Sequence, residues 1–256
     1  MSDWNRNTVA GAQTGTYAID EGLRAFMLRV YNYMAAGLAI TGVVAYVFYA
    51  MAVTNDPAGA AAQVRSGVYL TSFGAAIYTS ALKWVIMLAP LGMVFFLSAR
   101  LQKMSIQGAQ LAFWGFAALM GASLSSIFLV YTASSITQVF FITAASFGAL
   151  SLWGYTTKKD ISGWGSFLFM GLIGIIIASL VNLFVGSSAL QFAISVIGVL
   201  VFAGLTAYDT QQIKEMYYVG DDGTVRGRKA IMGALRLYLD FINLFMMLLS
   251  LFGNRE

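Results

Sequence analysis

Long apolar runs alternate with short polar segments along almost the whole chain. Seven of these runs approach or exceed the roughly 20 mainly apolar residues that a membrane-crossing helix requires. They lie at residues 28–52, 84–99, 108–130, 136–155, 165–185, 189–208 and 231–252. The second run is short and contains Pro90, which predicts a kinked or tilted helix. The apolar segment 67–82 is expected to lie at the membrane interface without crossing.

The runs predict an all-α fold, a polytopic membrane helical bundle of seven transmembrane helices. Three regions follow: a cytoplasmic N-terminal tail at 1–27, the transmembrane domain at 28–252 and a short C-terminal tail at 253–256. The first 27 residues are polar and mixed in charge, so no cleavable signal peptide is expected. The pattern leaves open whether the last run crosses fully or is re-entrant.

Composition supports a membrane protein and narrows its chemistry. Of the 256 residues, 59% are hydrophobic and 10% are charged, far too few polar residues to cover a water-soluble domain. The chain has no cysteine and no histidine, which excludes disulfides, thiolate metal sites, a cysteine nucleophile and the commonest general base. Proton chemistry must therefore use carboxylates, lysine or tyrosine. The basic residues are scattered between apolar runs, so we expect no nucleic-acid partner.

The lysines and arginines predict how the chain is oriented, because cytoplasmic loops are enriched in both. The N-terminal tail and its surroundings, together with the loops after the second, fourth and sixth runs, hold Arg6, Arg24, Arg29, Arg100, Lys103, Lys158, Lys159, Lys214, Arg226, Arg228 and Lys229. The other side holds only Arg65, Lys83 and Arg255. We therefore expect a cytoplasmic N-terminus.

Small residues recur at every fourth position in three of the runs. These are Gly37, Thr41 and Ala45 in the first, Ala117, Gly121 and Ser125 in the third, and Ala144 and Gly148 in the fourth. Such spacing lets helix backbones approach closely in lipid. Packing within one bundle is the favoured interpretation, and a dimer interface is the alternative.

Two aspartates are candidates for membrane depth. Asp240 lies ten residues after Ala230, about 15 Å into the membrane at about 1.5 Å per residue, which places it near the midplane. Asp209 stands at the end of the sixth run, where the helix is expected to continue. An ionised aspartate in the membrane is costly unless it is paired, so each marks a functional-site hypothesis.

The expected partners of these aspartates follow from helical spacing. Arg236 and Asn243 lie one turn before and one turn after Asp240 on the same helix face. The partners expected for Asp209 are Gln212 on its own helix and, across the bundle, either Asp240 or Arg100. The alternative is a purely structural role, with Asp209 at a helix end and Asp240 paired to Arg236.

The polar connection YVGDDGTVRGRKA between the sixth and seventh runs is short, so these helices are expected to be antiparallel neighbours. Asp209 and Asp240 could then face each other. Two adjacent carboxylates tend to share a proton, which would make the pair a pH sensor. The pair would also bind Ca²⁺, weakly and transiently, because tight binding takes six to eight oxygen ligands.

The segments FAGLTAYDTQQIK (202–214) and LYLDFINLF (237–245) together resemble the signature of the Bax inhibitor family, the transmembrane Bax-inhibitor-motif proteins. The similarity covers the seven-run layout from about residue 25 onward. The resemblance implies a multi-pass protein of the bacterial inner membrane, with a central last helix, that conducts a pH-sensitive calcium leak. Asp209 and Asp240 would form the pH-sensing pair, and Arg100, in FFLSARLQK, would latch onto Asp209 in the closed pore.

Other readings compete with the channel. Some bacterial members of this family are linked to the membrane-bound quality-control protease, so the chain could instead modulate that protease by binding it. Paired aspartates also occur in intramembrane aspartyl proteases, but the Gly-x-Gly-Asp motif of those enzymes is replaced here by Leu237, Tyr238 and Leu239 before Asp240. We therefore expect no enzymatic activity and no cofactor, with calcium as the transported ion and protons and the lipid bilayer as partners. The second run has no acidic residue, so a gating contact that needs a carboxylate there is absent.

Overall fold

The computed structural model describes the backbone of residues 3–65 and 67–255 and the side chains of residues 21–64 and 67–255. The predicted tail at 1–27 therefore lies mostly outside the described side chains. The α-helices are α1 (Asp3–Ala52), α2 (Ser72–Thr79), α3 (Leu82–Arg100), α4 (Ile106–Leu124), α5 (Ala133–Thr156), α6 (Trp164–Val185), α7 (Ser188–Glu215) and α8 (Gly223–Phe252). Two short 3-10 helices, η1 (Leu101–Lys103) and η2 (Ser125–Leu129), follow α3 and α4.

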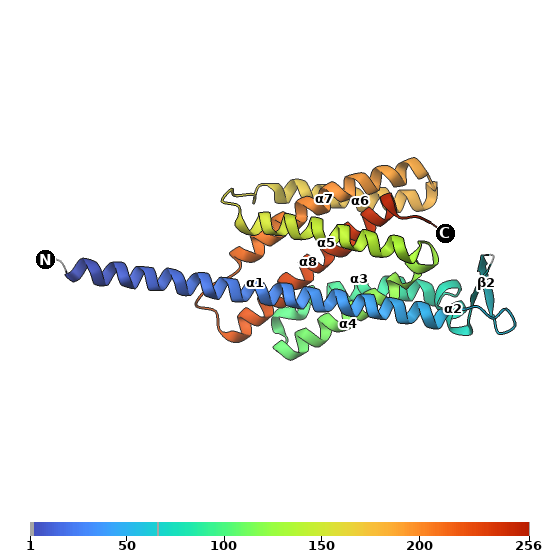
Figure 1. Ribbon diagram of the computed structural model, residues 1–256, viewed down its shortest axis with the longest axis horizontal. Coiled ribbons are helices and arrows are strands. Elements are labelled where there is room, and N and C mark those ends of the chain that lie inside the picture. The colour runs from blue at the N-terminus through green and yellow to red at the C-terminus, as the bar shows by residue number, and fades with distance from the viewer. Residues whose placement is uncertain (1–2, 66, 256) are drawn as a thin grey trace.

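Every helix except α2 is long and apolar enough to cross a membrane, which gives seven spans among the described residues. The prediction of an all-α polytopic bundle is confirmed (Figure 1). Three helices extend beyond their predicted runs. α1 begins at Asp3, α7 continues to Glu215, as expected for the segment after Asp209, and α8 already begins at Gly223. These extensions lie in polar sequence that hydropathy alone does not assign to a span.

A small antiparallel sheet follows α1. It has the order β1 (Val53–Thr54), β3 (Val68–Leu70) and β2 (Ala62–Arg65), with Val53 opposite Leu70 and Gln63 opposite Tyr69. The segment 67–82 therefore forms a strand and the eight-residue helix α2, which is too short to cross. The expectation that this segment does not cross is confirmed.

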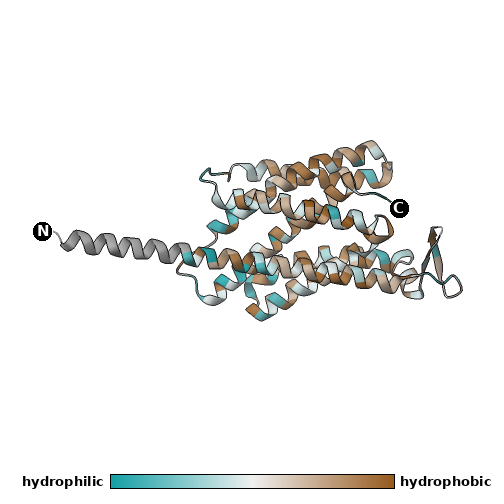
Figure 2. Cartoon of the chain, viewed as in Figure 1, coloured by the Kyte–Doolittle hydropathy of each residue, from teal (hydrophilic) through white to brown (hydrophobic). Residues whose placement is uncertain are grey.

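The connections of the bundle gather at two opposite ends (Figure 1). The α3–α4, α5–α6 and α7–α8 connections lie at one end, which we call the basic end because it carries Lys103, Lys158, Lys159 and Arg226. The sheet, α2, the α4–α5 and α6–α7 connections and the C-terminus lie at the other. The grouping of the loops predicted from the charge pattern is thus observed, and in Figure 2 the hydrophobic residues dominate the helices between the two ends.

Helix α8 runs through the bundle from one end to the other. At the basic end, Arg228 donates a hydrogen bond to the backbone carbonyl of Gln102, over 2.7 Å. Beyond its other end, the N–H of Asn254 donates to Ser135 Oγ over 2.9 Å, and the N–H of Thr132 donates to the carbonyl of Asn254 over 3.1 Å. The last helix therefore runs the full length of the bundle and is long and apolar enough to cross a membrane. It packs against α1, α4, α5 and α7, which confirms its central position.

The small-residue spacing correctly predicts one close helix contact. A Cβ added to Gly121 on α4 would lie 2.6 Å from the carbonyl oxygen of Thr41 on α1, so the two backbones touch there. The same prediction is wrong for α5, because an added Cβ at Gly148 would meet nothing within 4 Å. The close contact of α5 is at Gly154, where an added Cβ would lie 2.3 Å from the carbonyl oxygen of Ala207 on α7.

Candidate functional site

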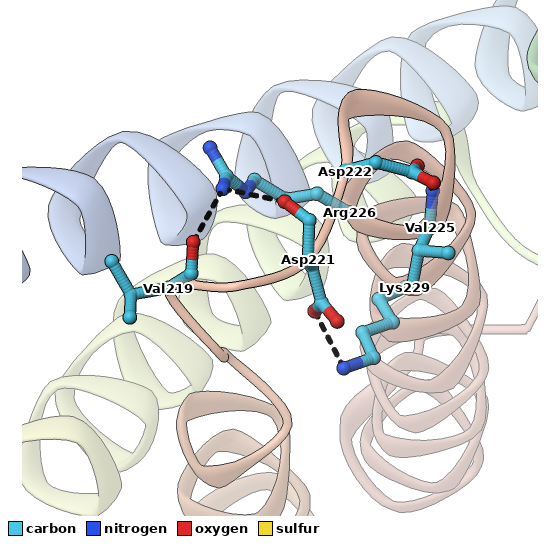
Figure 3. A network of polar contacts seen from close by, with 6 residues as sticks. All are labelled: Val219, Asp221, Asp222, Val225, Arg226 and Lys229. Atoms are coloured by element: carbon cyan, nitrogen blue, oxygen red, sulfur yellow. Dashed lines mark hydrogen bonds and ion pairs between the residues drawn. The ribbon is translucent and has the colours of Figure 1, made fainter.

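The candidate site lies between α7 and α8, two antiparallel helices joined by a short ordered turn (Figure 3). The Asp222 carboxylate accepts a hydrogen bond from the N–H of Val225 over 2.8 Å and so caps α8. Arg226 donates to the backbone carbonyl of Asp221 over 2.9 Å. Lys229 forms an ion pair with the Asp221 carboxylate at 2.6 Å. This turn fixes how the two helices enter the bundle.

Asp209 on α7 and Asp240 on α8 face each other across this helix pair. Their carboxyl groups are neighbours between the two helices. Arg236, one turn before Asp240, places its guanidinium 3.8 Å from Asp209 Oδ1. The short connection between the two helices predicted that Asp209 and Asp240 could face each other. The structure brings them together.

The two carboxyl groups differ in their surroundings. Asp240 is only 5% exposed, and its Oδ2 atom is buried without a hydrogen-bond partner in the described part of the chain. The Asp209 side chain is 17% exposed and that of Arg236 is 45% exposed. An ion pair as open as this contributes little to stability, so Arg236 acts chiefly as a local positive charge.

The two aspartates lie at different distances from the ends of their helices. Asp209 is about 9 Å before the end of α7, whereas Asp240 is about 26 Å from the start of α8, at about 1.5 Å per residue. They meet because α8 begins well outside α7 and then crosses the bundle obliquely (Figure 1). A depth counted from the apolar run alone misses this offset.

The other residues predicted for the site do not join the pair. Arg100 is exposed at the end of α3 and makes no hydrogen bond or ion pair with another described residue, so the cation beside Asp209 is Arg236. Gln212 donates to Glu215 over 3.1 Å, and Asn243 donates to the carbonyl of Leu239 over 2.8 Å. Neither amide is hydrogen bonded to an aspartate in the described part of the chain.

A chain of hydroxyl groups fixes α7 next to Asp209. Thr210 shares a hydrogen bond of 2.9 Å with Ser151 on α5, and Ser151 shares one of 2.8 Å with Tyr31 on α1. Thr210 also donates to the carbonyl of Thr206 in its own helix, over 2.7 Å. Three helices are thereby connected at the level of the aspartates, where the backbones of α5 and α7 also touch.

The next residues of the motif bind the α5–α6 loop. Gln211 is buried, accepts from the N–H of Ile161 over 2.9 Å and donates to the carbonyl of Lys159 over 2.8 Å. Lys214 donates to the carbonyl of Tyr155 over 2.9 Å and lies 5.5 Å from the centre of its ring. The sequence AYDTQQIK thus serves two purposes, because Asp209 belongs to the pair while its neighbours attach α7 to α5 and its loop.

Tyr238 connects the LYLDFINLF segment of α8 to α1 and α4. Its hydroxyl shares a 2.6 Å hydrogen bond with Thr41 on α1, and Thr41 also lies 2.9 Å from the carbonyl of Ala117 on α4. The ring is completely buried against Phe113 and Phe116. Because Tyr238 and Asp240 stand two residues apart, this contact also orients the aspartate.

Sequence reasoning missed Tyr31, Ser151, Thr210 and Gln211, and it identified Thr41 only as a small residue. One signal could have found some of them: hydroxyl and amide side chains inside apolar runs usually bond to neighbouring helices. Such a signal cannot say which helices are neighbours. The partners therefore required the structure.

The acidic groups form a pair and not a cluster. Among the described residues, no group of three or more acidic side chains gathers where it could hold a metal ion. Asp209 and Asp240 offer four carboxylate oxygens, fewer than the six to eight ligands of a tight Ca²⁺ site. What this arrangement can do is exchange a proton and attract a cation briefly.

Comparison with known proteins assigns the chain to a family. Residues 23–256 match the family model described as inhibitor of apoptosis-promoting Bax1. The chain belongs to the Bax inhibitor family. It is 48% identical over 237 residues to the inner membrane protein YbhL of Escherichia coli strain K12, covering 92% of this chain and 94% of that protein.

Two further relatives match the whole chain. A protein of Rickettsia prowazekii, RP147, is 45% identical over 256 residues, covering all of both chains. A protein of Caulobacter vibrioides is 44% identical over 260 residues, again covering all of both chains. The family resemblance predicted from the two motifs is confirmed, and both motifs lie within the matched region.

Proposed function

We propose that this Bax inhibitor family protein is a pH-sensitive calcium leak channel of the bacterial inner membrane, with its N-terminus in the cytoplasm. Asp209 and Asp240 are its gate. The observation that supports the proposal most directly is that Asp209 and Asp240 are neighbours inside the bundle, with Asp240 Oδ2 buried without a hydrogen-bond partner among the described residues.

The proposed gate follows from the chemistry of paired carboxylates. Two carboxyl groups in hydrogen-bonding contact hold one proton between them, and this joins α7 to α8. Loss of that proton leaves two negative charges side by side, which repel each other and attract a cation. A change of pH therefore changes both the α7–α8 contact and the charge that a passing Ca²⁺ ion meets.

Arg236 and Arg100 would have different parts in this gate. Arg236 already lies beside Asp209 and competes with Asp240 for its carboxylate. Arg100 is exposed at the basic end and is free to form a latch in another state of the protein. The latch is the part of the proposal that needs a conformational change.

The decisive experiment is calcium flux into liposomes that contain the purified protein, measured from about pH 5 to about pH 8. We expect a pH-dependent flux in the wild type and a flux insensitive to pH in Asp209→Asn and in Asp240→Asn. Asp56→Asn is the matched control, because Asp56 caps a turn in the loop between β1 and β2, at the opposite end of the molecule. It should behave as the wild type does.

A second control tests whether any polar change in α8 has the same effect. Asn243→Ala removes a side chain bonded only within its own helix and should keep the pH dependence. Flux no greater than that of empty liposomes at every pH would overturn the channel. The binding modulator of a membrane-bound protease would then be the reading to test, by co-purification with that protease.

A further inference from the structure

Two adjoining cavities open between α1 and α5 on the side of the bundle. The first, about 520 Å³, lies toward the basic end between Arg24, Tyr31, Ser151 and Tyr155. The second, about 580 Å³, continues toward the opposite end and has Phe241 and Phe245 of α8 in its lining. Ala35 lines both cavities, so they adjoin along α1, and we call the two together the α1–α5 groove.

The groove faces the region that the membrane occupies. Side chains along its edges are open to the outside: Leu28 is 51% exposed, Leu152 is 61% exposed and Val43 is 64% exposed. Most of the lining is aliphatic or aromatic, and no acidic side chain contributes to it among the described residues. The surface suits a hydrocarbon chain along its length.

The groove is positively charged where it opens at the basic end of the bundle. Arg24 lines it, and Lys214 lies beside Tyr155, another lining residue. Glu21 precedes Arg24 by one helical turn but does not line the groove. Basic pockets between transmembrane helices favour anionic lipid headgroups. Positive charge at one end of a hydrocarbon groove matches the shape of an anionic phospholipid.

We propose that the α1–α5 groove binds one anionic phospholipid, with its phosphate at Arg24 and one acyl chain lying along the groove past Ala35. The lipid lies over Tyr31 and Ser151, which line the groove and belong to the hydroxyl chain that ends at Thr210, next to Asp209. The site is thus in contact with the residues that position α7. The proposal does not depend on calcium conduction.

A glycine on the groove wall offers a direct way to block the site. Gly148 lines the first cavity, and a Cβ added there would meet no atom within 4 Å. We therefore expect the side chain of Gly148→Leu to occupy the groove while α5 keeps its place. Gly174→Leu on α6 is the matched control, since Gly174 also faces open space but does not line the groove.

The test is native mass spectrometry of the full chain released from nanodiscs with equal amounts of phosphatidylglycerol and phosphatidylcholine. We expect the wild type and Gly174→Leu to retain one phosphatidylglycerol, and Gly148→Leu to retain about tenfold less, a change of about 1.4 kcal/mol in binding. Equal retention by Gly148→Leu and Gly174→Leu would overturn the proposal. Because lipid retention is measured without flux, a failed channel experiment leaves this result unaffected.

A second pair of variants tests the headgroup contact. Arg24→Gln should retain phosphatidylglycerol and phosphatidylcholine equally, because the charge that selects the anionic lipid is gone. Arg29→Gln makes the same change at an exposed residue of α1 outside the groove and should keep the wild-type preference. Equal loss of preference in both variants would contradict the assignment of the phosphate to Arg24.

Discussion

Helices α6 and α8 show opposite relations between hydrophobicity and burial. α6 has no charged residue, yet only 17% of its most apolar 18-residue stretch is buried. α8 contains Arg236 and Asp240 within its crossing, yet 56% of the corresponding stretch is buried. In a membrane, the solvent is itself apolar, so the most hydrophobic helix can stay at the lipid surface. The helix with polar groups belongs inside, where those groups find partners.

Because α8 is buried and α6 is exposed, the two helices should differ most in stability when a large aromatic side chain is removed from each. Tyr238→Ala on α8 should lower the free energy of unfolding by about 3 kcal/mol, because it leaves a cavity in a fully buried site and removes a hydrogen bond. Phe184→Ala on α6 should change it little, since Phe184 is 92% exposed. Thermal unfolding in detergent measures both. Equal losses would show that α6 is as well packed as α8.

A smaller effect is expected when the same bulky side chain is added to each helix. Gly233→Leu on α8 places its Cβ about 2.9 Å from Ile213, so the core must shift at a cost of about 2 kcal/mol. Gly174→Leu on α6 meets open space and should be neutral or slightly stabilising, because leucine favours a helix more than glycine does. The unfolding midpoints of both variants measure this difference in stability. A destabilised Gly174→Leu would contradict the lipid-facing position of α6.

Removing the Thr41 hydroxyl, which holds α8, should lower the free energy of unfolding less than Tyr238→Ala or Gly233→Leu does. Thr41→Val leaves the buried Tyr238 hydroxyl without its partner and should lower the free energy of unfolding by about 1 kcal/mol. Thr137→Val is the control, because that exposed hydroxyl bonds only to Ala133 within α5. If both variants unfold at the same temperature, the Thr41 contact adds nothing to the position of α8.

The smallest effect concerns pH and a carboxylate outside the membrane spans. Hydrogen bonds from the side chain and backbone N–H of Ser162 lower the pKa of Asp160 below its usual value. A lowered folded-state pKa means that this contribution to stability is present above the usual aspartate value and is lost as pH falls through the folded value. Titration of Asp160 by NMR should show the lowered pKa, and Ser162→Ala should raise it. An unchanged pKa in that variant would exclude the Ser162 hydroxyl as a cause and leave the backbone N–H, which alanine keeps.

Much of the fold could be predicted from the sequence, because the membrane constrains it strongly. Backbone polar groups must be satisfied inside a hydrocarbon layer, so each apolar run of sufficient length becomes a helix. The same logic identified Asp209 and Asp240, since carboxylates at membrane depth are rare. It failed where a polar segment precedes the apolar run of a helix, as at the start of α8, because hydropathy marks lipid contact and not helix length.

Neighbour relations were harder to predict than helices. The spacing of small residues correctly predicted the contact at Gly121 but wrongly included Gly148, since a glycine facing lipid looks the same in sequence as one facing a helix. Arg100 was one of two partners expected for Asp209 across the bundle, and the cation beside Asp209 in this structure is Arg236. Both aspartates were known from the sequence, whereas their surroundings were not.

The sequence by itself determined the seven crossings, the family and the two carboxylates, because hydropathy, charge and short motifs are local properties that each segment carries alone. Only the tertiary structure decided that α8 runs from one end of the bundle to the other and that Asp209, Asp240 and Arg236 are neighbours. It also decided which hydroxyls support them and where a groove opens to lipid. These features depend on how helices cross, and many weak contacts between residues far apart in the chain set that geometry together.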